Sequence, residues 1–207
     1  GEGLTDEAIE QYREALKVEP HNTAVLSNLG FALAGQGKLD EAIELYHRAL
    51  ELDPGYVSAL TNLGAALASQ GRLDDAVVEY RRALESDPGY APAINNLAVA
   101  LSGLGKVEEA IPHYRRLLAL DPSNVAVRLN LGMALRRQGK IAEATAEFSE
   151  AVRLKPERAE AHYYLGLALA GQGKLPETVN ELSEAARLKP DMLHARYFLA
   201  LALVRLG

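Results

Sequence analysis

Histidine, aspartate, glutamate and lysine are the residues of this sequence that could act in catalysis or bind a metal ion. The histidines do not share a helix face at the four-residue spacing with which paired histidines hold zinc. They are His21, His47, His113, His162 and His194. The sequence has no cysteine, so it offers no thiolate nucleophile and no cysteine-ligated metal site. We expect no metal site and no cofactor.

Two further patterns resemble catalytic motifs but lack the context that those motifs need. The run Gly-Gln-Gly-Lys occurs at Gly35–Lys38 and Gly171–Lys174, but no strand precedes it, as a phosphate-binding loop requires. The acidic pairs Asp40–Glu41 and Asp74–Asp75 lie in the first turns of expected helices, where they complement the helix dipole. Their adjacent carboxylates do not face each other across a cleft. We therefore predict that this chain by itself is not an enzyme.

The elements that carry these residues recur with a period of 34 residues. A period of about 20 to 50 residues indicates a solenoid, in which each unit packs on its neighbours. Prolines keep this period at Pro20, Pro54, Pro88, Pro122, Pro156 and Pro190. Glycines keep it at Gly3, Gly37, Gly71, Gly105, Gly139, Gly173 and Gly207.

Each unit is predicted to be a helical hairpin, as residues 23–56 illustrate. Leu26, Leu29 and Leu33 share one face of a first helix. Gly37 ends that helix, because glycine tolerates the left-handed conformation found at helix C-termini. A second helix follows and ends before Pro54, because the residue before a proline is pushed out of the helical region.

The period divides the chain into five full repeats between two half-repeats. The half-repeats are residues 1–22 and 193–207, and the full repeats are residues 23–56, 57–90, 91–124, 125–158 and 159–192. We therefore expect an all-α fold, with about 12 helices in a single array over residues 1–207.

The repeated positions resemble those of the tetratricopeptide repeat family over the whole chain. In residues 23–56 the resemblance is carried by Leu29, Gly30, Ala42, Tyr46, Ala49 and Pro54. It implies a right-handed superhelix of antiparallel helix pairs, an α-solenoid, whose first helices line a concave groove that binds proteins or peptides. One position departs from the family's apolar habit in the later repeats, where it holds Arg128, His162 and Arg196. We expect looser or wetter packing there.

An asparagine recurs on the first helix, on the face opposite its apolar stripe. It is found at Asn28, Asn62, Asn96 and Asn130, and the position then becomes Tyr164 and Phe198. An amide both donates and accepts hydrogen bonds, so this column could hold the backbone of an extended polypeptide. It resembles the asparagine ladder in the repeat region of O-linked N-acetylglucosamine transferases. The alternative is that asparagine suits a partly exposed helix position and is bonded within its own repeat.

Further candidate residues of a peptide-binding groove lie beside this column. They are Ser27, Thr61, Asn95, Arg136, Arg137, Tyr163 and Tyr164. The aromatic side chains could seat an apolar side chain, and the arginines could meet an acidic residue of a ligand. The alternatives are that aromatics near the C-terminus belong to the core at the end of the array, and that the arginines mark a solvated helix end.

Composition narrows the class of partner. A net charge of −6, with basic and acidic residues interleaved, argues against nucleic acid. No apolar run approaches the about 20 residues that span a bilayer, so membrane insertion is not expected. The lack of cysteine leaves the compartment open, with a slight preference for the cytoplasm. Because the first residue is Gly, we expect that the chain was processed or cut from a longer protein.

The leading functional hypothesis is a scaffold that binds a protein or peptide in its groove. One alternative is the substrate-recruiting arm of a larger glycosyltransferase, which the asparagine column suggests. Another is an assembly module that acts through its ends. The sequence opens with an unpaired second helix and closes with an unpaired first helix, so copies could associate head to tail. The alternative is that flanking repeats exist in the full protein and were cut away.

Overall fold

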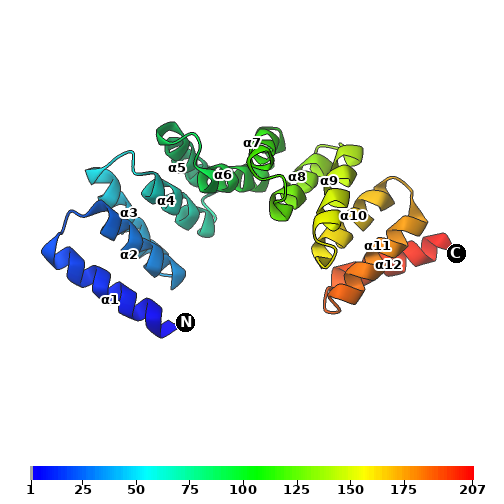
Figure 1. The fold of residues 1–207 in the computed structure, drawn as a ribbon, viewed down its shortest axis with the longest axis horizontal. Helices are drawn as coiled ribbons and strands as arrows, with labels where there is room; N and C mark the ends of the chain where they lie inside the picture. The colour runs from blue at the N-terminus through cyan, green and yellow to red at the C-terminus, as the bar shows by residue number, and fades with distance from the viewer. Residues whose placement is uncertain (1) are drawn as a thin grey trace. The chain divides into compact units, whose positions relative to one another are not determined.

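The computed structural model describes the main chain of residues 2–207 and the side chains from residue 5 onward. These residues form twelve α-helices and no strand, which confirms the all-α prediction. Figure 1 shows the helices in chain order. They are α1 (Glu2–Val18), α2 (Thr23–Gly35), α3 (Leu39–Leu52), α4 (Val57–Ser69), α5 (Leu73–Ser86), α6 (Ala91–Gly103), α7 (Val107–Leu120), α8 (Val125–Arg137), α9 (Ile141–Leu154), α10 (Ala159–Gly171), α11 (Leu175–Leu188) and α12 (Leu193–Leu206).

The chain forms two compact units, Gly1–Gly105 with α1 to α6 and Lys106–Gly207 with α7 to α12. Within each unit every helix packs against the next one along the chain. The even-numbered helices are the first helices of the expected repeats, and neighbours among them also touch: α2 with α4, α4 with α6, α8 with α10, and α10 with α12. The boundary between the units falls between the two helices of the expected repeat 91–124.

Glycine ends most first helices in the predicted way. Gly37 has a φ of 78°, a left-handed conformation that carries no steric cost without a Cβ atom. Its N–H donates to the carbonyl of Ala34 at 2.9 Å, and the Lys38 N–H donates to that of Leu33 at 3.0 Å. These bonds satisfy carbonyls that the end of the helix would otherwise leave unpaired. The chain is thereby turned directly into α3.

The small residue of the first helix makes room for the aromatic ring of the second. A Cβ atom placed on Gly30 would lie 2.7 Å from Cε1 of Tyr46, and one on Gly64 would lie 2.5 Å from Cε1 of Tyr80. Side chains do not tolerate such distances. The two helices of a hairpin therefore approach closely at this level, and Tyr46 and Tyr80 are buried there.

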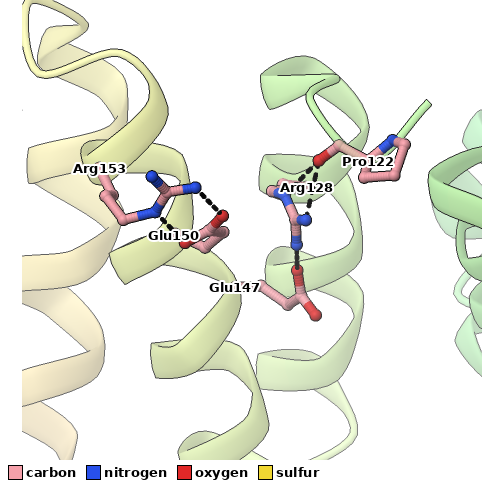
Figure 2. A network of polar contacts seen from close by, with 5 residues as sticks. All are labelled: Pro122, Arg128, Glu147, Glu150 and Arg153. Atoms are coloured by element: carbon pink, nitrogen blue, oxygen red, sulfur yellow. Dashed lines mark hydrogen bonds and ion pairs between the residues drawn. The ribbon is translucent and has the colours of Figure 1, made fainter.

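Arg128 occupies a position of α8 that is apolar in the first repeats, and its guanidinium is hydrogen-bonded there. Its Nη1 donates to Oε2 of Glu147 on α9 at 2.7 Å, while Nε and Nη2 donate to the Pro122 carbonyl oxygen at 3.1 and 2.8 Å. Figure 2 shows these contacts beside the exposed pair of Glu150 and Arg153. The side chains of Arg128 and Glu147 keep only 16% and 24% of their exposure.

His162 repeats this geometry one period later. Its Nδ1 lies 2.7 Å from Oε2 of Glu181 on α11, and its Nε2 lies 2.8 Å from the carbonyl oxygen of Pro156. Both ring nitrogens face acceptors, so both contacts are hydrogen bonds only when both nitrogens carry a proton. In these two repeats a hydrogen-bonded polar layer thus takes the place of an apolar one. Arg196, the third residue of the series, is exposed.

No helix among the described residues is both long and apolar enough to cross a membrane.

Candidate functional site

The asparagine column places amides on adjacent first helices of the first unit. Asn28 of α2 is exposed, while Asn62 of α4 and Asn96 of α6 are half-buried. Asn96 accepts a hydrogen bond from Asn95 at 3.4 Å. Within the described residues, Asn28 and Asn62 make no side-chain hydrogen bond, and neither does Asn130 on α8 of the second unit. Binding within its own repeat therefore does not account for most of the column.

Two cavities of the first unit lie beside these amides. Asn28 lines a cavity of about 290 Å³ between α1 and α2, together with Tyr12 and Phe31. Asn62 lines a smaller one of about 160 Å³ between α2, α3 and α4, together with Phe31 and Ser69. The described residues that line the two cavities are all uncharged. The column thus borders shallow, neutral hollows that suit a main chain or a small side chain.

Two expected groove residues turn inward instead. Ser27 is 1% exposed and its hydroxyl has no hydrogen-bond partner, while Thr61 is buried and donates to the Val57 carbonyl at 2.8 Å. Each precedes its asparagine by one residue, which rotates it by about 100° toward the core. Neither side chain is open to a ligand.

A cavity of about 490 Å³ belongs to the second unit. It brings together two of the predicted residues, Arg136 of α8 and Tyr163 of α10. Tyr164 and Arg137 are not part of its lining. The residues that line it are Arg136, Tyr163, Leu167, Ala170, Gly171, Leu175, Thr178, Phe198, Leu201, Ala202 and Arg205.

Aromatic rings form one wall of this cavity. The ring centroids of Tyr163 and Phe198 are 6.2 Å apart, and Tyr164 lies 5.2 Å from Tyr163 and 5.6 Å from Phe148. Burial raises the pKa of Tyr163, Tyr164 adds to the rise and the positive charge of Arg136 opposes it. Arg136 and Tyr163 line the same cavity. Tyr197, at the end of the cluster, is 61% exposed.

Equivalent positions of the repeat line this cavity and a cavity of the first unit. Leu167, Leu175, Phe198 and Leu201 lie four periods after Phe31, Leu39, Asn62 and Ala65, which line the 160 Å³ cavity. That cavity lies among helices followed by further helices of the same unit, so an unpaired end is not required to form it. Leu167, Leu201 and Arg205 were not predicted from the sequence, although their spacing from the asparagine column could have identified them.

Charge distinguishes the first helices of the two units. Helices α2, α4 and α6 contain no charged residue, whereas α8 and α12 contain arginine and no acidic residue. Arg136 and Arg205 are exposed and have no ion-pair partner among the described residues. The cavity of the second unit therefore combines apolar walls with two free guanidinium groups, in a chain of net charge −6. Such a site can hold an apolar side chain beside a carboxylate.

The described residues contain no group of three or more His, Asp or Glu side chains placed to hold a metal ion. The cavity of the second unit likewise contains no acidic residue that could act as a general base.

Solved structures with the same fold include a protein described as YrrB, a TPR protein with an unusual peptide-binding site. It is 23% identical to this chain, with a TM-score of 0.80 over 91% of this chain and 97% of its own. A MamA protein is 25% identical, with a TM-score of 0.75 over 81% of this chain and 92% of its own. A fragment of MamA from Desulfovibrio magneticus RS-1 is 19% identical, with a TM-score of 0.78 over 82% and 96%. No curated protein matches the sequence.

The family model of the tetratricopeptide repeat matches residues 1–57, 29–91, 95–156 and 129–181. These segments cover most of the chain and include the asparagine column and the residues of both polar layers. Together with the paired helices and the conserved period of the turns, they identify the fold. The chain belongs to the tetratricopeptide repeat family.

Proposed function

We propose that the protein is an interaction scaffold that binds an extended segment of a partner protein along its first helices. The observation that carries this proposal is the cavity of the second unit, which combines aromatic walls with the free guanidinium groups of Arg136 and Arg205. Its volume of about 490 Å³ is within the range of ligand sites. One or two apolar side chains of the segment enter it, and an acidic side chain meets the arginines.

The first unit contributes less specific contacts. The amides of Asn28 and Asn62 donate to and accept from the main chain of the segment, which they recognise without reading its sequence. Each such hydrogen bond contributes only about 0.5–1.5 kcal/mol. Specificity is therefore assigned to the second unit, and the asparagines add affinity for any extended chain. The description of YrrB as a peptide-binding TPR protein supports this type of ligand.

The test is the binding of a labelled, C-terminally amidated peptide in which leucine and glutamate are separated by glycine and serine. Fluorescence anisotropy should show a loss of affinity of about tenfold for Arg136→Glu, since an attractive charge becomes a repulsive one. Tyr163→Ala should weaken binding by removing an aromatic wall. Arg116→Glu is the matched control, because Arg116 is exposed on α7 and lies outside the cavity.

Equal affinity of the protein and the Arg136→Glu variant would show that the arginine does not recognise the peptide. A peptide with glutamine in place of the glutamate should bind more weakly, and equal affinity of the two peptides would also show that the arginine does not recognise the acidic side chain. Unchanged binding after Asn62→Ala and Asn96→Ala together would remove the asparagine column from the site.

We also propose that copies of the chain associate head to tail. Two observations favour it: Leu203 of α12 is 48% exposed where the equivalent Leu135 is 1% exposed, and Tyr12 of α1 is half-buried where Tyr46 is fully buried. Each terminal helix thus exposes a surface that other repeats bury within a hairpin. Light scattering should detect association that grows with concentration, and a monomer at all concentrations would contradict it.

A further inference from the structure

One cavity of the first unit is formed only by helices that have neighbours on both sides. It is the cavity of about 160 Å³ between α2, α3 and α4, which Phe31 and Asn62 line. Helix α2 packs on α1, α3 and α4, helix α3 packs on α2 and α4, and helix α4 packs on α5 and α6 as well. The walls of this cavity therefore do not depend on either end of the chain.

The walls of the cavity are uncharged and mostly apolar. None of the described residues that line it carries a charge. Phe31 is one of these walls, and its ring is 66% exposed although it belongs to the body of α2. The equivalent positions of α4 and α6 hold the smaller Ala65 and Val99. A charged group in this cavity would lose hydration without gaining a partner, so the lining favours a single uncharged side chain.

Two polar groups of the lining have no hydrogen-bond partner among the described residues. Tyr46 is 1% exposed, and its hydroxyl is one of them. The half-buried amide of Asn62 is the other. The hydroxyl of Ser69, which also lines the cavity, donates to the Ala65 carbonyl oxygen at 2.9 Å. Buried polar side chains are mostly paired, because an unpaired one costs free energy. Tyr46 and Asn62 thus offer a donor and an acceptor to a group that enters the cavity.

The hydroxyl of Tyr46 is neutral and fixed in position. Burial raises the pKa of Tyr46 strongly, because the ionised form would lose its hydration. A Cβ atom placed on Gly30 would lie 2.7 Å from Cε1 of Tyr46 and 3.0 Å from Cζ, the atom that carries the hydroxyl. With the backbone of α2 this close, the ring keeps its place, and the hydroxyl presents its hydrogen from a fixed point.

We propose that this cavity is a subsite that binds the carboxamide of an asparagine or glutamine side chain of the partner segment. The Tyr46 hydroxyl donates to the carboxamide oxygen, and the side-chain oxygen of Asn62 accepts from the carboxamide nitrogen. The aliphatic stem of the ligand side chain packs against Phe31. An amide has two donor hydrogens and an oxygen with two lone pairs, so Asn62 also has capacity for the main chain of the segment. This inference rests on the proposed function and adds to the first unit one contact that depends on the sequence of the ligand.

Side chains of similar shape fit this subsite less well. Leucine has nearly the shape of asparagine, but its methyl groups would cover the two polar groups of the cavity and leave them unpaired. Aspartate has the same shape too, but its charge meets no cation among the described residues of the lining. Each hydrogen bond contributes about 0.5–1.5 kcal/mol, so asparagine should bind about three- to tenfold more tightly than either.

Nuclear magnetic resonance of the whole chain tests the subsite. The probes are short, blocked glycine peptides with a single guest residue, which is asparagine, leucine or aspartate. Their main chains are identical, so any difference reports on the guest side chain. The asparagine probe should shift the signals of Phe31 and of the Asn62 side-chain amide at about three- to tenfold lower concentration than the other two. Equal responses, or a stronger response to leucine, would overturn the assignment to a carboxamide. The absence of any shift at these residues would overturn the subsite.

The variant Tyr46→Phe removes the hydroxyl and keeps the ring, as Phe148 does at the equivalent position of α9. It should bind the asparagine probe about three- to tenfold more weakly and the leucine probe as before. Tyr80→Phe is the matched control, because Tyr80 lies one period later and outside the lining. An asparagine preference that survives Tyr46→Phe would overturn the proposal. Circular dichroism of each variant checks that the helices are retained.

The variant Ala65→Val fills the cavity with the residue that α6 has at this position, Val99. It should weaken the binding of the asparagine and leucine probes alike, and unchanged binding would show that the probes do not enter the cavity. The anisotropy test of Arg136→Glu reports on the second unit alone. It therefore succeeds or fails independently of these probes, so a failure of the subsite is distinguishable from a failure of the proposed function.

Discussion

Arg128 and Glu147 form a charged pair at a position where an earlier repeat has two leucines, Leu26 and Leu45. Both solutions are found in one chain: Leu26 and Leu45 are buried, whereas Arg128 and Glu147 are half-buried. An internal ion pair contributes stability only when both partners are present, since either one alone is left without compensation. A leucine pair has no such dependence. The chain thus offers a matched comparison of ionic and apolar packing.

Arg128→Leu should lower the free energy of unfolding by about 1–3 kcal/mol, because it leaves Glu147 and the Pro122 carbonyl without their donor. Arg128→Leu combined with Glu147→Leu should recover most of this loss by reproducing Leu26 and Leu45. Urea denaturation of the two single variants and the double variant measures the coupling. Additive losses in the double variant would show that the ion pair is not a unit.

Tyr46 and Tyr80 should make the first unit sensitive to alkali. Burial raises the pKa of Tyr46 strongly and that of Tyr80 to about 12. A tyrosine with a raised pKa stays neutral in the folded state while the unfolded chain ionises near its usual pKa of about 10. The two buried tyrosines therefore contribute their full share to the free energy of unfolding below about pH 10, and this contribution is lost as the pH rises toward 12.

Absorbance at about 295 nm should show that these two tyrosines ionise only as the helices unfold. Tyr80→Phe should move the alkaline transition to higher pH, since phenylalanine has no group to ionise. A transition that stays in place would show that other groups control it.

The hairpin is the element that the sequence predicts best. The period of proline and glycine places every turn, and apolar spacing identifies both helices, because these features depend on local backbone geometry. The polar layers were harder to predict, since Arg128 and His162 look like breaks in an apolar stripe until their partners on the facing helix are known. Ser27 and Thr61 failed as groove residues because one residue along a helix decides between surface and core.

Two glycines of α2 should respond to alanine substitution with opposite changes in the free energy of unfolding, because only one of them lies where the helices of the hairpin approach closely. Gly30→Ala should lower the free energy of unfolding by about 1–3 kcal/mol, because the new Cβ atom would meet the ring of Tyr46. Gly35→Ala should raise it by about 0.4–1 kcal/mol, since nothing lies within 4 Å of that position and alanine favours the helix. Thermal unfolding of the two variants checks the signs. Stabilisation by Gly30→Ala would contradict the close packing of α2 and α3.

At the scale of the whole molecule, the first helices α2, α4 and α6 of the first unit are uncharged, whereas α8 and α12 of the second unit bear arginine. The proposed ligand contacts therefore divide into neutral and ionic sets. The ionic contacts should weaken with salt and the neutral contacts should not, because salt screens only charges. Each set of contacts belongs to one unit.

Binding of the leucine and glutamate peptide should weaken several-fold between about 0.05 M and 0.5 M NaCl, because the arginines are exposed and their attraction is screened. The Arg136→Glu variant should lose most of this salt dependence. Anisotropy titrations at several salt concentrations measure both slopes. A salt-independent affinity of the unaltered protein would assign recognition to the apolar walls alone.

The change from apolar layers in the earlier repeats to polar layers in the later ones also affects which helices pair while the chain folds. Because the repeats have similar sequences, a helix of one repeat can pair with a helix of the wrong repeat. Most helix interfaces of a repetitive chain would allow such a mispairing. Helix α8 paired with α3 instead of α9 would place the guanidinium of Arg128 against Leu45, which offers no acceptor at the position that Glu147 holds in α9. Such a misfolded state carries a buried, uncompensated charge and is disfavoured. The polar layers therefore disfavour mispaired helices. In the later hairpins they destabilise wrong pairings that the shapes of the helices alone would allow.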